Sequence, residues 1–306
     1  MSKPNLNLQA LANTSFAINL ALALGQGLPS FVGRPLTKVV ADAIVRQPNS
    51  QLVKVLRTNL WAASGCTLNA AELDLQVRQV FRKHIRSLWD FYHNLNRPNK
   101  VKEMVSFSPK FQALFDQASG DGQARLFLTV HTSNFELAGR VLALRGLEFQ
   151  ILSMPQPPSG YKLQNKIRRD AGMEITPMSV EAFQSARERL RRGGTVVTGI
   201  DRPLAQTRHK VKFFDRPALL PVAYVQLALQ TGAPMIVVAC VSKPDGEYEV
   251  TCTDPVIAQA YPDRDLELIY NAEAVLQKAE EIIRPRPTDW CMFYPIWPEL
   301  ETAVPL

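Results

Sequence analysis

One histidine lies in a setting that suits acid–base chemistry. His131 follows the apolar run 126–130 and has a carboxylate, Glu136, five positions later. An imidazole can accept and release a proton near neutral pH, and a nearby carboxylate can orient it and stabilise its cation. The apolar run is bounded upstream by turn residues at 119–122, which predicts a buried strand over 125–130. His131 would then lie at the carboxyl end of a strand, where open α/β sheets bind ligands.

Purely structural explanations compete with this interpretation. Ser133 and Glu136 have the spacing of a capping box, in which the serine hydroxyl accepts from the glutamate amide and the carboxylate reaches back to the serine amide. The helix dipole also favours an acid in the first turn. His131 could equally be a core histidine with its hydrogen bonds satisfied. Capping and catalysis do not exclude each other at Glu136, so the local sequence leaves both open.

A second acid and base follow another predicted strand, at 195–200. Asp201 and Arg202 come directly after it, and they should reach the same sheet edge as His131. Such a pair can orient a catalytic group or bind phosphate through the guanidinium, and it can also be a local ion pair in a turn. Further along the predicted cleft, the helix at 161–171 carries Arg168 among other basic residues and suits anionic head groups.

The order of predicted elements indicates an α/β fold. Strands and helices alternate after residue 119, which predicts a central, largely parallel sheet flanked by helices. The last two strands are joined by a short turn at 244–247, which predicts an antiparallel pair. The predicted helices are 36–62 with a break at 47–50, 70–95, 108–118, 161–171, about 179–193, 221–230 and 264–283; the other predicted strands are 148–153, 173–176, 234–241 and 248–254.

The first 33 residues contain an apolar segment from Phe16 to Val32. It is shorter than the ~20 apolar residues that a membrane span needs and is interrupted by polar residues and proline. It also lacks the basic start and cleavage site of a signal peptide. A helix lying in the membrane interface and a packed amphipathic helix are both compatible with it. We expect a membrane-associating segment at 1–33 and a single domain at 34–306, with a helical part (34–118) and an α/β core (119–306).

Composition narrows the classes of partner. The 306 residues include 35 Lys and Arg against 28 Asp and Glu, a net charge of +7, which favours anionic partners such as a lipid surface, phosphate groups or an acidic carrier protein. No nucleic-acid-binding signature is present, and we expect no such partner. The four cysteines and four histidines lack the spacing of metal ligands, so we expect reduced, buried cysteines and no metal site.

Several stretches together resemble one protein family. His131 and Glu136 match the His-x4-Asp/Glu motif of the lysophospholipid acyltransferase superfamily. Their surroundings are similar to its lipid A late acyltransferase branch of lauroyl and myristoyl transferases, which includes mycobacterial phosphatidylinositol mannoside acyltransferases. Alone, the five-residue spacing is weak evidence, but the ordered set is fairly specific. The other matching stretches are 57–61 (RTNLW), 201–203 (DRP), 213–218 (FFDRPA), 231–234 (TGAP) and 289–297 (DWCMFYPIW).

The resemblance implies an O-acyltransferase that moves a fatty acyl chain to a hydroxyl of a membrane lipid or glycolipid. The implied donor is a thioester, acyl carrier protein or coenzyme A, and no further cofactor is implied. His131 and Glu136 would be catalytic, and Asp201 and Arg202 would form a second motif. Asn134 and Arg168 are further candidates for substrate binding. The implied location is the cytoplasmic face of the inner membrane, with peripheral or weak anchoring.

Two other function classes fit parts of the sequence. A hydrolase could use Ser133 or Thr132 as nucleophile with His131 as base, although no Gly-x-Ser-x-Gly elbow is present. A non-catalytic lipid-binding protein on the membrane could also keep this pattern. A thioesterase assay with and without acceptor lipids would separate all three classes.

Overall fold

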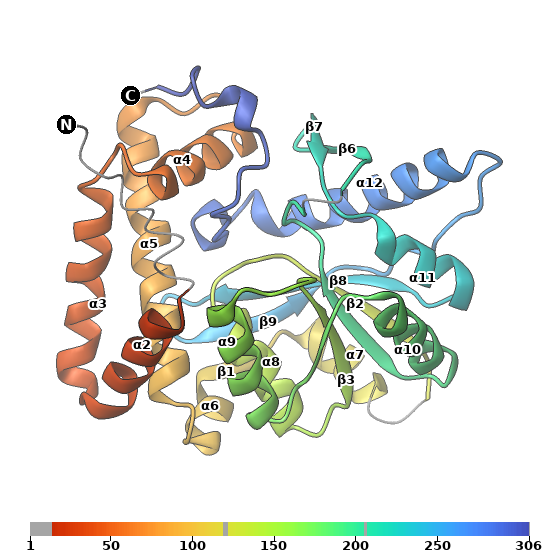
Figure 1. Cartoon of the computed structure of the whole chain (residues 1–306), viewed down its shortest axis with the longest axis horizontal. Helices are drawn as coiled ribbons and strands as arrows, with labels where there is room; N and C mark the ends of the chain where they lie inside the picture. The colour runs from red at the N-terminus through yellow and green to blue at the C-terminus, as the bar shows by residue number, and fades with distance from the viewer. Residues whose placement is uncertain (1–13, 119–121, 205–206, 306) are drawn as a thin grey trace.

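The computed structural model describes residues 14–118, 122–204 and 207–305. A seven-stranded sheet carries α7–α9 on one face and α10–α12 on the other, and the helices α2–α5 stand beside it (Figure 1). The helices are α2 (Ser15–Gly27), α3 (Ser30–Val45), α4 (Gln51–Ala63), α5 (Ala70–His93), α6 (Pro98–Met104), α7 (Pro109–Ala118), α8 (Phe135–Leu144), α9 (Ser159–Asp170), α10 (Val180–Arg191), α11 (Ala223–Thr231) and α12 (Arg264–Ile283), with the 3-10 turns η1 (Pro287–Asp289) and η2 (Pro298–Leu300). The strands are β1 (Val105–Phe107), β2 (Arg125–Thr129), β3 (Phe149–Ser153), β4 (Glu174–Pro177), β5 (Thr195–Gly199), β6 (Lys210–Phe213), β7 (Arg216–Leu219), β8 (Met235–Ser242) and β9 (Tyr248–Cys252).

The sheet has the order β1-β9-β8-β2-β5-β3-β4, with β2 in the middle. Only β8 and β9 are antiparallel neighbours in it, and the other described pairs are parallel. The predicted α/β class, the largely parallel sheet and the antiparallel last pair are therefore confirmed. The sequence prediction missed β1 at one edge and the separate β6–β7 hairpin, both of which are short.

The central strand is buried on both faces, which explains its unbroken apolar sequence. Leu126 and Leu128 face the cluster that α10, α11 and α12 complete, whereas Phe127 faces the cluster under α7 and α8. Alternate side chains of a strand point to opposite faces, so a single apolar run supplies both layers of the core. The carboxyl end of this strand is therefore held rigidly from two sides.

The N-terminal helices combine a packed side with an exposed apolar side. α2 packs against α5 and α9, and Ile18 is buried there. Phe16 on α2 and Phe31 on α3 are 74% and 79% exposed. No helix in the described part of the chain is long and apolar enough to cross a membrane. Residues 1–13 of the predicted 1–33 segment lie outside the described residues, and the predicted domain boundaries stay predictions.

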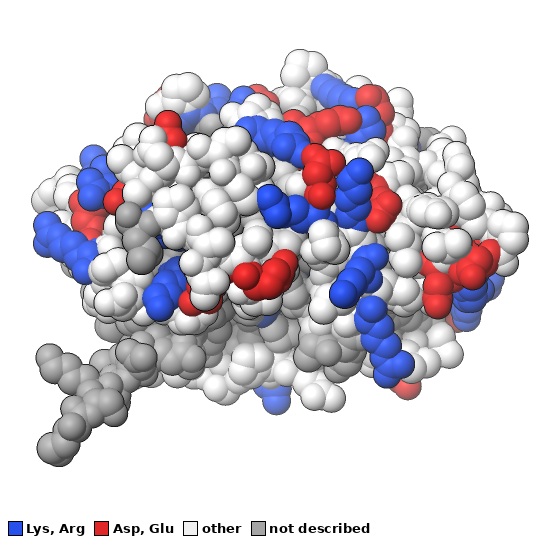
Figure 2. All heavy atoms as spheres, turned by 90° about the horizontal axis from the view of Figure 1, so that it is seen from above, with Lys and Arg blue, Asp and Glu red and all other residues white. Residues whose placement is uncertain are grey.

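Charged side chains on one face of the molecule are interleaved. Figure 2 shows blue and red spheres side by side on this face. The described residues include ion pairs near the surface, such as Arg284 with Glu280 and Lys212 with Asp215. Surface pairs of this kind contribute little to stability.

Candidate active site

His131 and Asp201 are brought together by the register of two neighbouring strands. β2 and β5 are parallel, and Thr129 at the end of β2 pairs with Gly199 at the end of β5. His131 lies two residues beyond Thr129, and Asp201 lies two residues beyond Gly199. The two side chains therefore leave the sheet at the same level and side by side. The predicted meeting of the two motifs at one sheet edge is what the structure shows.

The Asp201 carboxylate holds the imidazole in place. Asp201 Oδ1 lies 2.6 Å from His131 Nδ1, and Asp201 Oδ2 accepts the backbone N–H of His131 at 2.8 Å. Trp290 Nε1 donates to the same Oδ2 at 2.8 Å, and both Asp201 and Trp290 are fully buried. With Nδ1–H donated to the carboxylate, Nε2 is the ring nitrogen free to accept a proton. Nε2 has no hydrogen-bond partner among the described residues.

The C-terminal segment fixes the loop that carries His131. Cys291 N donates to His131 O at 2.7 Å, and Ser133 N donates to Asp289 O at 2.7 Å. These bonds make a short antiparallel bridge in which Thr132 lies opposite Trp290. Ser133 has a φ of 27°, a rare backbone conformation for a residue other than glycine, and the bridge holds it there.

Two side chains from the N-terminal helices anchor the same segment. Lys83 on α5 donates to the buried carboxylate of Asp289 at 2.7 Å. Asn59 on α4 donates to the carbonyl oxygens of Met292 and Tyr294 and accepts from Ile296 N. The buried Asn59 therefore has a structural role. The matching stretches at 57–61 and 289–297 are thus two sides of one contact.

Glu136 has a different partner from the one expected. Arg168 on α9 donates to both of its carboxylate oxygens, from Nε at 2.9 Å and from Nη2, and Gln164 adds a bond at 2.8 Å. Burial lowers the pKa of Arg168, but the Glu136 charge more than offsets this and raises the pKa, so Arg168 is a cation. The expectation that Glu136 orients His131 is therefore corrected, because Asp201 makes that contact. Any catalytic role of Glu136 stays a prediction.

The expected capping box is also wrong. Asn134, one residue later than predicted, is the N-cap of α8, and its side chain accepts from Leu137 N at 3.2 Å. Its amide nitrogen donates to Ser87 O at 3.1 Å. The amide of Ser133 is directed instead at Asp289 O. Asn134 thus has a structural role here, and its predicted contact with substrate stays a prediction.

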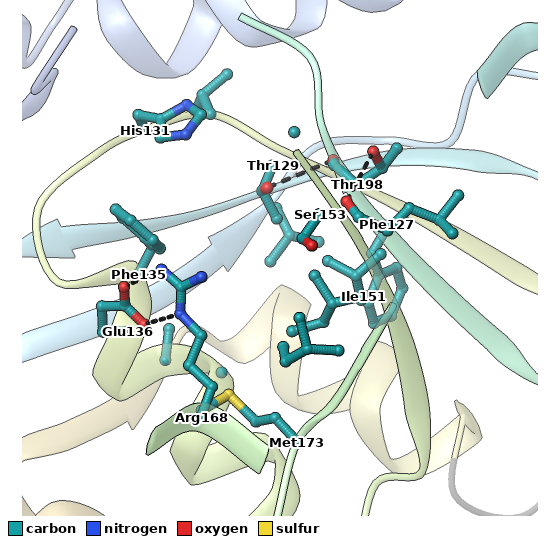
Figure 3. A pocket seen from close by; sticks show the side chains of 18 of the residues that line it. Phe127, Thr129, His131, Phe135, Glu136, Ile151, Ser153, Arg168, Met173 and Thr198 are labelled. Carbon is teal, nitrogen blue, oxygen red and sulfur yellow. Dashed lines mark hydrogen bonds and ion pairs between the residues drawn. The ribbon is translucent and has the colours of Figure 1, made fainter. Parts of the chain in front are cut away.

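A narrow apolar pocket opens beside His131. It has a cavity volume of about 150 Å³ and lies between the sheet and helices α8 and α9. His131, Glu136, Arg168 and Arg202 line its polar end, and the rest is mainly apolar. Figure 3 shows Glu136 directed at Arg168, while Phe127, Ile151 and Met173 line the deeper part. The pocket suits a slender apolar chain whose polar end lies at the imidazole.

Arg202 is a buried cation in the wall of this pocket. Its guanidinium carbon lies 3.7 Å from the centroid of the Tyr294 ring, and Nε has no hydrogen-bond partner. No carboxylate in the described part of the chain pairs with it, so the local ion pair considered from the sequence is not what the structure shows. Aromatic faces stabilise a desolvated guanidinium while leaving its N–H groups available. Arg202 can therefore receive negative charge that develops in the pocket.

Ser133 and two buried cysteines of the site are poorly suited to act as nucleophiles. Ser133 Oγ donates to Asp289 Oδ1 at 3.0 Å and makes no bond with His131. Burial raises the pKa of Cys240, which lines the pocket, and raises that of Cys291 to about 12. Both thiols therefore stay protonated at neutral pH and are weak nucleophiles. This geometry favours direct use of the imidazole as a base.

Comparison with known proteins identifies the family of the chain. A family described as bacterial lipid A biosynthesis acyltransferase matches residues 3–299. The chain belongs to this family. The relationship predicted from the ordered motifs is thereby confirmed, and the family is one of acyltransferases.

Named relatives are more distant. Over 189 residues the chain is 28% identical to the phosphatidylinositol mannoside acyltransferase of Mycobacterium tuberculosis (strain ATCC 25618 / H37Rv), covering 60% of this chain and 57% of that protein. The protein of the same name from Mycolicibacterium smegmatis (strain ATCC 700084 / mc(2)155) is 24% identical over 183 residues, 58% of this chain and 57% of that protein. Among solved structures, the 1-acyl-sn-glycerophosphate (LPA) acyltransferase PlsC from Thermotoga maritima has a TM-score of 0.37 and 13% identity, covering 83% of this chain and 98% of that one. The chain thus spans little more than half the length of the curated relatives that it matches.

Proposed function

We propose that the protein transfers a fatty acyl chain from a thioester donor to a hydroxyl of a membrane glycolipid. The observation that carries this proposal is the His131–Asp201 pair at the polar end of a narrow apolar pocket. An imidazole base needs an orienting carboxylate, and an acyl group needs an apolar chain site next to that base. The named mycobacterial relatives act on a glycolipid, phosphatidylinositol mannoside, which supports this acceptor class.

The chemistry needs no covalent enzyme intermediate. Asp201 accepts the Nδ1–H of the neutral imidazole, which leaves Nε2 as the nitrogen that can accept a proton, and His131 Nε2 removes the proton of the acceptor hydroxyl. The acceptor oxygen then forms a bond to the thioester carbonyl carbon. As the carbon–sulfur bond breaks, the sulfur leaves with the electron pair and takes the proton from Nε2. The products are an ester and a free thiol, and His131 returns to its starting state.

Arg202 supplies positive charge for the oxygen on which negative charge develops. It lines the same pocket as His131, and no carboxylate among the described residues pairs with it. A preorganised donor in a site shielded from water stabilises an oxyanion more than a solvated one does. The donor is acyl carrier protein or coenzyme A, both of them anionic, and we expect no other cofactor.

We place the protein on the cytoplasmic face of the inner membrane through its N-terminal helices. α2 and α3 expose a set of apolar side chains, and an amphipathic helix of this kind binds a lipid interface by burying them. The set is Phe16, Leu20, Leu24, Phe31, Val32, Leu36, Val39 and Val40. Replacing Phe16 and Phe31 together by serine should weaken binding to anionic vesicles at low salt. Unchanged co-sedimentation of this variant would contradict the membrane assignment.

The decisive experiment compares transfer with hydrolysis. The protein is incubated with palmitoyl acyl carrier protein or palmitoyl coenzyme A, with and without vesicles that contain phosphatidylinositol mannoside or a lipid A precursor. Mass spectrometry then follows the acylated lipid and the free fatty acid. We expect an acylated lipid that requires the acceptor. Free fatty acid regardless of acceptor would indicate the hydrolase, and no consumption of either donor would indicate a non-catalytic lipid-binding protein.

A further inference from the structure

A second, wider groove adjoins the apolar pocket. It has a cavity volume of about 920 Å³ and lies between α10 and α11, on the face of the sheet opposite α8. Met178, Leu204 and Pro221 line both the groove and the apolar pocket, so the two share a wall. The groove therefore lies next to the pocket that contains His131. The chemistry outlined above uses none of the groove's polar residues.

Two arginines in the groove lack carboxylate partners. Arg187 on α10 has a buried Nε without a hydrogen bond, and neither it nor Arg208 forms an ion pair with any described residue. Two other arginines lie at the end of α10 and do form ion pairs: Arg189 pairs with Glu174, and Arg192 pairs with Glu188. Arg187 and Arg208 in the groove, like Arg191 outside it, have no such partner among the described residues. A guanidinium kept partly buried without an anion is suited to receive one.

The rest of the groove indicates what surrounds that anion. Gln184, Gln226 and Gln230 bring carboxamide groups from two helices, and amides both donate to and accept from hydroxyls. Phe183 and Leu227 provide an apolar floor. Among the described residues that line the groove, none is acidic. Arginines with amides over an apolar floor match a phosphate ester that carries hydroxyl-bearing groups.

We propose that this groove binds the phosphate ester of a substrate, with Arg187 and Arg208 as its ligands, while the reacting end lies at His131. The inference rests on the acyl transfer proposed above and assigns a substrate group to a region that the reaction itself does not use. Two sources carry the same chemistry: the head group of the acceptor lipid, and the phosphates of the thioester donor. The groove and the pocket that contains His131 share three lining residues, which makes both sources candidates.

Direct binding tests the inference without any turnover. Isothermal titration of the full chain uses two water-soluble probes, glycerophosphoinositol for a lipid head group and coenzyme A for the donor. Arg187→Gln and Arg208→Gln should each raise the Kd of one probe by at least ~10-fold, the expected size for a lost hydrogen bond to a charged group. The matched control is Arg191→Gln, which removes the same charge from an exposed position on the same helix outside the groove. It should leave both Kd values unchanged.

Each outcome supports or overturns the assignment. Weakened binding of glycerophosphoinositol alone places the acceptor phosphate in the groove, and weakened binding of coenzyme A alone places the donor there. Failure of both probes to bind the natural chain at millimolar concentration would overturn the inference. So would equal effects of Arg187→Gln and Arg191→Gln, which indicate a general charge effect. Thermal midpoints of all variants show whether Arg187→Gln folds, and the exposed Arg208 gives a second variant. If acyl transfer is absent but Arg187→Gln still weakens a probe, the proposed function fails and this inference stands.

Discussion

Two carboxylates lie close to the polar end of the apolar pocket, and the protein uses them differently. Asp201, at the end of β5, receives hydrogen bonds from the ring and the backbone of His131 and from Trp290. Glu136, in the first turn of α8, receives both of its arginine bonds from Arg168. One carboxylate therefore orients a base, while the other neutralises a buried cation. The carboxylate that orients His131 is not the one nearer to it in sequence.

Strand register explains the difference. Glu136 lies five residues after His131 and is already in the first turn of α8. From this position its side chain faces α9. Asp201 is seventy positions away but leaves the neighbouring parallel strand at the same level as His131. Rigid strand ends place catalytic groups more accurately than the loop and helix start that follow them. Substitutions at the two carboxylates should therefore have different consequences.

The largest expected effect is on turnover in Asp201→Asn. Asparagine is close to aspartate in size but cannot stabilise a protonated imidazole, and its amide can bind the wrong ring tautomer. We expect kcat to fall by ~100-fold or more, in the range typical of lost general-base assistance. Steady-state kinetics of acyl transfer and thermal midpoints should be measured together. Asp265→Asn is the matched control, since Asp265 pairs with the half-buried His209 away from the pocket at 3.2 Å; equal losses in both variants would refute the assignment.

A large effect on stability, with a smaller one on turnover, is expected for Glu136→Gln. The Glu136–Arg168 pair is buried, and removing one partner of a buried pair costs about 3–5 kcal/mol because the other charge is left unpaired. Chemical denaturation should show this loss, and the double variant Glu136→Gln with Arg168→Gln should recover part of it. We expect kcat of the folded single variant to change by less than ~10-fold. A stable Glu136→Gln protein without turnover would instead restore the catalytic role expected from the family motif.

An intermediate effect is expected at Trp290, which binds the catalytic carboxylate and not the substrate. Trp290→Phe keeps the aromatic packing but removes the N–H donor to Asp201 Oδ2. A hydrogen bond to a charged group contributes about 1.5–3 kcal/mol, so we expect roughly a 10-fold fall in kcat from a looser carboxylate. KM and the thermal midpoint should change little. A higher KM with an unchanged kcat would indicate that Trp290 supports the fold of the pocket and does not position Asp201.

The sequence predicted the strands that position the site better than the hydrogen bonds within it. Apolar runs such as 126–130 and 195–200 predicted β2 and β5, and parallel strand ends predicted that His131 and Asp201 would meet. Trp290 and Asp289 were noticed only as part of a family motif, because an aromatic tail shows no pattern that reveals one indole N–H directed at a carboxylate. The cap at Asn134 was missed by one residue, since the positive φ of Ser133 depends on its bond to the distant Asp289. Hydrogen bonds between residues far apart in sequence have no local pattern from which to predict them.

The smallest expected effect concerns the helix that carries Glu136. If α8 is chiefly a wall of the pocket, enlarging a side chain on it should change acyl-chain selectivity and leave the chemistry intact. Gly139 lines the pocket, and a Cβ there would lie 2.9 Å from Met173 Sδ, so Gly139→Val must displace Met173 and fill the deeper part. We expect kcat/KM for long chains to fall by a few-fold, because one or two buried methylene groups contribute about 0.8 kcal/mol each. The shortest chains that are turned over serve as the internal control and should be unaffected. An equal loss at every chain length would mean that α8 supports catalysis itself. The contrast between Asp201 as a catalytic carboxylate and Glu136 on α8 as a structural one would then be weaker.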